Sequence, residues 1–252
     1  MNTEILYGIH PVLESLKTGR RIFHEIYIAK EASSKRIAKI EERAGSKGIR
    51  VKSTDMQRLS RLAATTHHQG VGARVSPYPL TAIGDIVDRS KSDGDHSFLI
   101  LLDNVVDPHN LGAVIRTALA IDVDGIIIPR DRAAGPTPAV SKASAGALEH
   151  GRLCRVTNMV TVIKMLKEKG FWIYGLDTVA DQSLYATDLC GDLALVIGGE
   201  EKGIRSLVKR HCDLMLSIPQ TGRVNSLNAS VAAAVAIFEA FRQRAVASAT
   251  KD

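Results

Sequence analysis

The chain has 252 residues, of which 45% are hydrophobic and only 4% aromatic, and its formal net charge is +6. This length allows one large domain or two modest ones with a buried core. No uncharged apolar run reaches the eighteen residues of a membrane span, and the N-terminus lacks the basic and then apolar pattern of a signal peptide. We therefore expect a soluble, cytoplasmic protein with no membrane partner.

The positive charge is concentrated in the first third of the chain. Residues 1 to 75 contain 14 lysines and arginines against 7 acidic residues, whereas residues 76 to 252 contain 19 against 20. A small basic module joined to a neutral larger part favours binding of a polyanion by the module. Surface lysines that only maintain solubility are the alternative.

The three cysteines do not form a recognisable site. Cys154, Cys190 and Cys212 are widely spaced and include no Cys-x-x-Cys pair. This spacing argues against a disulfide framework and against zinc, and the sequence predicts no metal.

Residues 1 to 75 alternate between strand and helix patterns, which is typical of a compact α/β domain. We expect strands over 4–7, 25–29, near 51 and over 71–75, and helices over 10–16, 33–44 and 55–62. The second of these helices directs basic side chains outward, namely Lys35, Arg36, Lys39 and Arg43.

Two features of this module limit how it can bind RNA or metal. His67 and His68 are adjacent, so they cannot both face one metal from a regular strand; an RNA contact and a simple turn both stay open for them. Tyr7, Phe23 and Tyr27 are too few for a base-stacking sheet, which favours contacts to RNA shape and backbone.

Residues 76 to 95 are rich in proline, glycine and aspartate and are expected to be a linker with a short helix over 83–89. Residues 96 to 252 form the second predicted domain. Apolar strands are expected over 98–102, 125–128, 154–156, 171–176, 193–197 and 214–218, and helices over 109–120, 136–148, 160–169, 204–210 and 226–244. Continuous apolar strands between helices predict a parallel sheet covered on both faces.

Three polar motifs follow strands of this second domain. The first contains Asn110 near a helix start and Arg116 off its apolar stripe; the second is Gly198-Gly199-Glu200-Glu201-Lys202-Gly203. The third runs from Ile218 through Ser226, Leu227 and Asn228 into the last helix. Because the carboxyl ends of parallel strands share one edge, we expect the motifs to converge on one crevice. Taken singly, each is also compatible with helix capping, a plain turn or a solvated arginine.

Together the motifs resemble those of the SpoU (TrmH) family of S-adenosylmethionine-dependent RNA 2′-O-ribose methyltransferases, in the SPOUT superfamily. The segments Tyr7 to Glu14 and Thr137 to Glu149 narrow the resemblance to members that methylate a guanosine in the peptidyl-transferase region of 23S rRNA. The resemblance implies an α/β fold with a C-terminal trefoil knot, preceded by a small ribosomal-protein-like RNA-binding domain. It also implies a homodimer in which the last helix and the helix of the first motif pack together.

The resemblance further implies roles for individual residues. Gly198, Ile218 and Leu227 lie on loops that hold the methyl donor, and Arg116 activates the ribose hydroxyl. Asn110, Glu200, Ser226 and Asn228 assist. Since a guanidinium is a poor proton acceptor, we expect Arg116 to hold a phosphate and stabilise the developing oxyanion. Gln220, Asn225 and Ala229 depart from the commoner residues of the family.

Two other functions stay open at this point. A tRNA guanosine 2′-O-methyltransferase would use the same chemistry, although the separate N-terminal module favours rRNA. A catalytically silent RNA-binding protein of ribosome assembly is the second alternative, and the presence of Asn110, Arg116, Glu200 and Asn228 argues against it.

Overall fold

The protein contains two β-sheets, each in a compact unit of its own. The structure is a computed structural model that describes residues 2–92, 96–223 and 226–249. Unit 1 comprises Met1–Pro79 and Pro136–His150, and unit 2 comprises Leu80–Gly135 and Gly151–Asp252.

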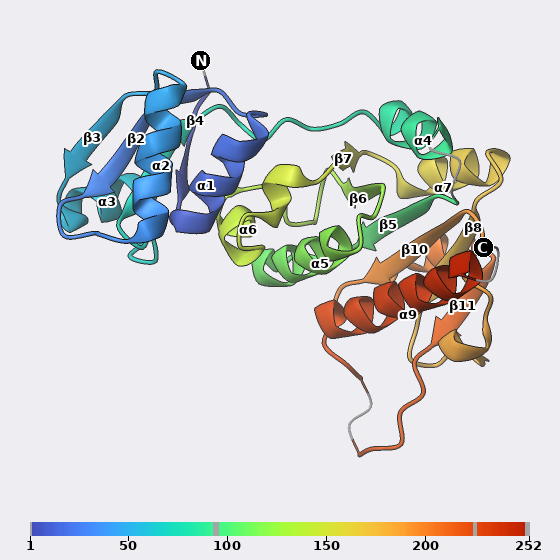
Figure 1. Cartoon of the computed structure of the whole chain (residues 1–252). Helices are drawn as coiled ribbons and strands as arrows, with labels where there is room; N and C mark the ends of the chain where they lie inside the picture. Colours follow the sequence, from blue (N-terminus) through green and yellow to red (C-terminus); the bar gives the residue numbers. More distant parts are fainter. Residues whose placement is uncertain (1, 93–95, 224–225, 250–252) are drawn as a thin grey trace. The chain divides into compact units, whose positions relative to one another are not determined.

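Unit 1 contains the four strands and three helices expected from the N-terminal sequence, with two further helical turns. The strand order of its sheet is β1-β4-β2-β3, where β4 is antiparallel to both neighbours and β2 is parallel to β3. The elements are β1 (Glu4–Tyr7), α1 (Ile9–Thr18), β2 (Phe23–Ala29), α2 (Lys35–Ser46), β3 (Val51–Thr54), α3 (Met56–Ala63), β4 (Val71–Val75), α6 (Pro138–Ala143) and the 3₁₀ turn η1 (Ala147–His150), most of them labelled in Figure 1.

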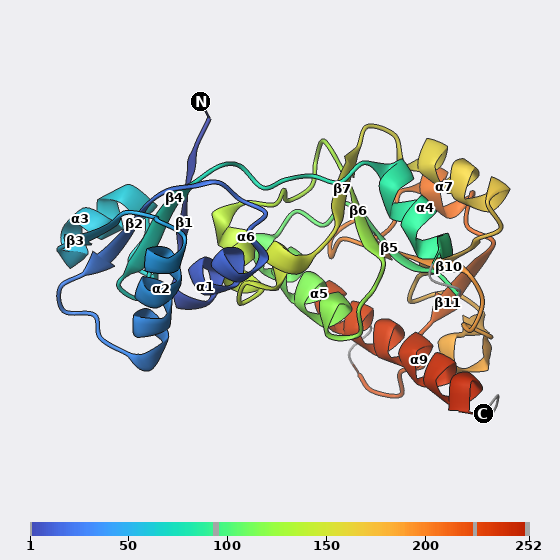
Figure 2. The same cartoon turned by 45° about the horizontal axis from the view of Figure 1, so that its top comes forward.

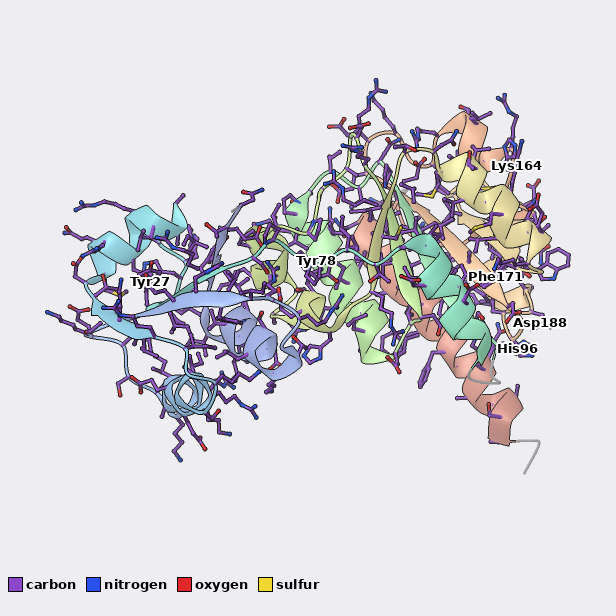
Figure 3. The ribbon with its side chains drawn as sticks, turned by 90° about the horizontal axis from the view of Figure 1, so that it is seen from above. Tyr27, Tyr78, His96, Lys164, Phe171 and Asp188 are labelled. Atoms are coloured by element: carbon purple, nitrogen blue, oxygen red, sulfur yellow. The ribbon has the colours of Figure 1, made fainter. Side chains whose placement is uncertain are left out.

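Both faces of this sheet are covered. Leu16 of α1 and Ile40 of α2 pack with Ile26 on one face. Leu59 of α3 packs with Tyr27, which Figure 3 labels, on the other. The alternation of Ile26 and Tyr27 between the two cores follows from the period of two residues in a strand.

Residues 136–150 belong to unit 1, whereas the sequence analysis assigned them to the second domain. Glu149 explains the difference. Its carboxylate accepts hydrogen bonds of 2.7 and 3.0 Å from Arg21 and one of 2.8 Å from Ser141, and Glu149 and the Arg21 side chain are almost fully buried. A buried carboxylate needs such partners, so this segment packs against residues far from it in sequence.

Unit 2 has a seven-stranded sheet in which every pair is parallel, which confirms the predicted α/β class. The strand order is β7-β6-β5-β10-β8-β11-β9. The elements are α4 (Ile83–Ser92), β5 (Phe98–Asp103), α5 (Pro108–Ala120), β6 (Gly125–Pro129), β7 (Leu153–Val156), α7 (Met159–Glu168), β8 (Trp172–Leu176), β9 (Gln182–Ser183), the turn η2 (Leu184–Ala186), β10 (Leu193–Gly198), α8 (Ser206–Lys209), β11 (Leu214–Ser217) and α9 (Ala229–Ala249).

Helices cover both faces of the larger sheet. Side chains of α4, α7 and α8 share one core with Leu99, Leu101 and the buried Phe171, which is labelled in Figure 3. On the other side α9 runs beside α5 and crosses β10, as Figure 2 shows. The buried faces of Ala233, Ala236 and Ala240 allow this close approach of α9.

The short helix predicted over 83–89 is confirmed as α4, and its Ile86 and Val87 are buried in the core of unit 2. One sequence prediction needs correction. The last helix begins at Ala229 rather than at Ser226, because the Asn228 side chain accepts the free backbone N–H groups of Ser230 and Val231 and so caps the helix.

Candidate active site at the carboxyl edge of the larger sheet

A pocket of about 490 Å³ lies at the carboxyl ends of β8, β10 and β11. Its lining includes the strand ends and the loops that follow them, among them Leu176, Gly198, Leu216, Ile218 and Leu227. This is the edge at which ligands bind in open α/β sheets, and the volume suits a small organic molecule. All three residues predicted to hold the methyl donor, Gly198, Ile218 and Leu227, line this pocket.

The glycines at the end of β10 allow backbones to approach closely. A Cβ added to Gly198 would lie 2.2 Å from the carbonyl carbon of Gly203, and one added to Gly199 would lie 2.0 Å from the oxygen of Asn104. No side chain fits at either position, because both distances are much shorter than a van der Waals contact and the atoms met belong to the backbone, which cannot move aside independently. The second motif therefore forms a tight loop against the first.

The three motifs meet in one hydrogen-bond network. Asn110 Nδ2 donates to Glu200 Oε1 at 2.9 Å, and Asn228 Nδ2 donates to Asn110 Oδ1 at 3.1 Å and also to Glu200 Oε1. Asn110 is buried at the third position of α5, whose first turn is capped by Asp107. Two neutral amides thus hold one carboxylate at the rim of the pocket.

The loop before α9 supplies the remaining predicted residues of the third motif. Ser226 and Leu227 are both exposed and both line the pocket. Both residues precede Ala229, the first residue of α9, and so lie outside the helix. Asn225 lies outside the described residues.

Arg116 is separated from this network. It is exposed on α5, one and a half turns beyond Asn110, and it is not among the described residues that line the pocket. Within the described part of the chain the Glu200 carboxylate is hydrogen-bonded to Asn110 and Asn228.

The sequence analysis missed an ion pair in the pocket. Asp177 and Lys209 are paired and both line the cavity, as do Thr178 and Lys202. Burial acts to raise the pKa of Asp177, but the hydrogen bond and charge of Lys209, together with hydrogen bonds from the backbone N–H groups of Val179 and Thr178, outweigh it and lower that pKa below its ordinary value. Asp177 follows β8, and the convergence rule that singled out residues after β5, β10 and β11 applies equally to it.

The histidines and cysteines do not form a second site. His68 is buried, with Nε2 2.9 Å from Ser60 Oγ and Nδ1 accepting from the Gly70 N–H at 3.1 Å, so it belongs to a turn. Burial raises the pKa of the Cys212 thiol to about 12, which keeps it protonated and unreactive. The described residues contain no group of three side chains suited to hold a metal ion, and their helices include none long and apolar enough to cross a membrane.

Comparison with known proteins agrees with this geometry. Residues 97–238 match the SpoU rRNA Methylase family, and residues 5–81 match the model described as RNA 2′-O ribose methyltransferase substrate binding. The chain is 40% identical over 242 residues to the 23S rRNA (guanosine-2′-O-)-methyltransferase RlmB of Escherichia coli, which covers 96% of this chain and 99% of that protein.

Two further proteins are similar to this chain, one in sequence and one in fold. An uncharacterised tRNA/rRNA methyltransferase of Synechocystis is 42% identical over 96% of this chain, which spans 63% of that protein's length. The SpoU methyltransferase AviRb of Streptomyces viridochromogenes, solved in complex with the cofactor AdoMet, superposes with a TM-score of 0.80 at 24% identity, covering 97% of this chain and 91% of that one. At this identity the likeness concerns the fold alone.

Proposed function

The chain belongs to the SpoU rRNA methylase family, and on that premise we propose that it methylates the 2′-hydroxyl of a guanosine ribose in the peptidyl-transferase region of 23S rRNA. The observation that carries the proposal is the network of Asn110, Glu200 and Asn228 at the rim of the 490 Å³ pocket. It joins the three motifs that the family shares, and the chain matches its 23S-directed relative over nearly the whole length of both.

The proposed methyl donor is S-adenosylmethionine, which supplies an electrophilic methyl group on a positively charged sulfur. The pocket fits it in volume, and its lining offers both carboxylates and ammonium groups to the charged groups of the donor, namely Asp177, Glu200, Lys202 and Lys209, beside the hydroxyl of Thr178. Gly198, Ile218 and Leu227 would hold the donor through the backbone groups of their loops, where missing or apolar side chains leave those groups accessible.

A C-terminal trefoil knot is part of the proposal. Support comes from the close approach of Gly198 and Gly203 and from the pocket that the loops after β10 and β11 share with the start of α9. Knots are very rare in proteins, so no general rule of chain topology would lead us to expect one. The proposal of a knot in this chain depends on its membership of the family.

Arg116 is proposed to act on the substrate side of the site. Its guanidinium cannot accept a proton near neutral pH, so it would hold a phosphate of the RNA and stabilise negative charge on the ribose oxygen. Its exposed position on α5 leaves it accessible to RNA. Asn110, Glu200 and Asn228 would order the loops, and the exposed Ser226 would contact the nucleotide.

The basic module of residues 1–75 is proposed to recruit the rRNA. This module has a net excess of seven positive charges. Four of its basic side chains are exposed on the outer face of α2, namely Lys35, Arg36, Lys39 and Arg43. Phosphate contacts of this kind supply affinity and orientation without reading sequence. The same proposal places the protein in the cytoplasm, where rRNA is made in bacteria.

The proposed functional state is a homodimer that uses α9. Val231, Phe238 and Phe241 of this helix are 44 to 48% exposed, and the two phenylalanine rings lie 6.2 Å apart in an edge-to-face pair. Exposed aromatic side chains in a cluster are typical of protein interfaces. Burial of this face against α5 and α9 of a second copy would remove it from water.

The decisive experiment is transfer of labelled methyl from S-adenosylmethionine to purified 23S rRNA and, in parallel, to total tRNA, followed by mapping of the modified residue. Label on a single 2′-O-methylguanosine of 23S rRNA is the expected result. Label on tRNA alone would overturn the choice of RNA while keeping the chemistry. Binding of rRNA without binding of S-adenosylmethionine would favour a silent assembly protein.

A further inference from the structure

The loop that carries Glu200 is short and closed on itself. It runs from Gly199, the residue after β10, to Arg205, the residue before α8. Gly203 N–H donates to the Gly199 carbonyl at 2.9 Å, and the two glycines form an isolated antiparallel bridge. Gly203 has φ 56°, a left-handed conformation that glycine adopts without strain. Glu200, Lys202 and Gly203 of this loop line the pocket.

One residue on the neighbouring strand holds both ends of this loop. Asp103 is the last residue of β5 and pairs in register with Gly198 of β10. Its carbonyl oxygen accepts from Gly199 N–H at 2.9 Å, and its carboxylate accepts from Arg205 N–H at 2.8 Å. The first bond fixes where the loop begins and the second fixes where it ends.

The Asp103 carboxylate is also neutralised by Arg205. The guanidinium donates from Nε at 2.8 Å and approaches from Nη2 at 2.6 Å. Asp103 is fully buried, whereas the Arg205 side chain is 42% exposed. A buried carboxylate is stable only with such partners, and three donors from one residue give it a single preferred position.

We infer that Asp103 is a positioning residue for the proposed methyl transfer, acting through the loop of Gly199 to Arg205. It sets the distance between the ends of that loop, and so places Glu200 beside Asn110 and Asn228 while keeping Lys202 and Gly203 at the wall of the pocket. This inference rests on the proposed function, because it assigns Asp103 to the same pocket.

The chain offers a matched control in Asp124, the residue before β6. Asp124 accepts from the N–H of Phe98, the first residue of β5, at 2.7 Å. It therefore bonds to the opposite end of β5, away from the pocket. Asp124→Asn and Asp103→Asn each remove one carboxylate charge, at opposite ends of β5, but only the second change affects the loop of Glu200.

The test measures S-adenosylmethionine affinity by calorimetry, kcat and KM for methyl transfer, RNA affinity, and the thermal midpoint of each variant. For Asp103→Asn we expect S-adenosylmethionine affinity to fall by about tenfold or more and kcat to fall with it, at unchanged RNA affinity. We expect the thermal midpoint to fall by a similar amount in Asp103→Asn and in Asp124→Asn. The Asp124→Asn variant should keep the S-adenosylmethionine affinity and the kcat of the wild type.

Two outcomes would overturn the inference. One is an Asp103→Asn protein that binds S-adenosylmethionine and turns over like the Asp124→Asn control. If Asp103→Asn does not fold, Arg205→Gln decides instead, because the Arg205 side chain is partly exposed and the change removes the guanidinium that gives the buried Asp103 carboxylate its single position. Wild-type affinity and kcat in that variant would likewise refute the role. A wild-type protein that fails to bind S-adenosylmethionine would refute the proposed function itself, which is a different result.

Discussion

Asn228 and Glu200 are joined by a hydrogen bond from the Asn228 amide to the Glu200 carboxylate, while the oxygen of the same amide caps α9. A single side chain thus serves both as a helix cap and as a link between the second and third motifs. These two roles can be separated by substitution, because the cap needs an oxygen acceptor close to the backbone whereas the link needs a donor on a side chain long enough to reach the Glu200 carboxylate.

Asn228→Ser is expected to keep the cap and to lose the link. We predict a thermal midpoint near that of the wild type with methyl transfer reduced by roughly tenfold or more, equivalent to about 1.4 kcal/mol in the barrier. Asn228→Ala should lose both, with a further cost of about 0.5 to 2 kcal/mol in stability from the missing cap. Equal activity of the serine variant and the wild type would show that the link to Glu200 has no part in turnover.

Substitution of Arg116 tests its proposed electrostatic role. Arg116→Lys keeps a positive charge and should retain measurable methyl transfer, whereas Arg116→Ala should lose roughly a hundredfold or more because no charge then faces the ribose oxygen. The measurement is single-turnover transfer at saturating RNA. If both variants lose activity equally while RNA binding stays intact, the planar geometry of the guanidinium, not its charge, is the essential property.

The buried pair of Arg21 and Glu149 should dominate the stability of unit 1. Glu149→Ala leaves Arg21 buried without its bidentate partner, and we expect a loss of about 3 to 5 kcal/mol. Native-state hydrogen exchange of the β4 amides measures this change within unit 1. Lys17→Ala is the control, since it removes the exposed pair with Glu14 and should cost less than about 1 kcal/mol. Comparable losses in both variants would contradict the prediction.

His68 should make unit 1 sensitive to mild acid. Burial, with the nearby charge of Lys142, lowers its pKa below 6.5, and its Nδ1 accepts from a fixed N–H, so the folded protein holds it neutral. As pH falls below 6.5 the unfolded chain binds a proton that the folded one does not. Stability is therefore full above pH 6.5 and declines as pH falls toward the folded pKa.

Urea denaturation followed by circular dichroism at pH 7.5 and 5.5 measures this decline. His68→Gln removes the titrating group, so the difference in stability between the two pH values should shrink in that variant. A pH dependence equal to that of the wild type would assign the effect to other groups.

Gly199 should tolerate no side chain. In Gly199→Ala the new Cβ would meet the Asn104 carbonyl, whose backbone cannot yield without moving the end of β5. We expect a lowered thermal midpoint and weakened S-adenosylmethionine binding. Gly84→Ala in α4 is the control, because nothing lies within 4 Å of its added Cβ and alanine favours a helix by about 0.5 to 1 kcal/mol. An unperturbed Gly199→Ala protein would refute the close packing of the two loops.

The sequence by itself determined the classes and most boundaries of the elements. The strand over 71–75 appears where the sequence predicted it, and the helix predicted over 55–62 appears as α3, because periodicity depends on neighbours within a few residues. The convergence of Asn110, Glu200 and Asn228 was also predictable, since parallel strands direct their carboxyl ends to one edge.

Only the tertiary structure decided which distant residues become partners. Glu149 and Arg21 are 128 residues apart, and their pairing moved the segment 136–150 from the predicted second domain into unit 1. The pair of Asp177 and Lys209 in the pocket was likewise settled by packing. Local patterns contain no information on such contacts, because burial and charge compensation arise only when the chain brings separate elements together.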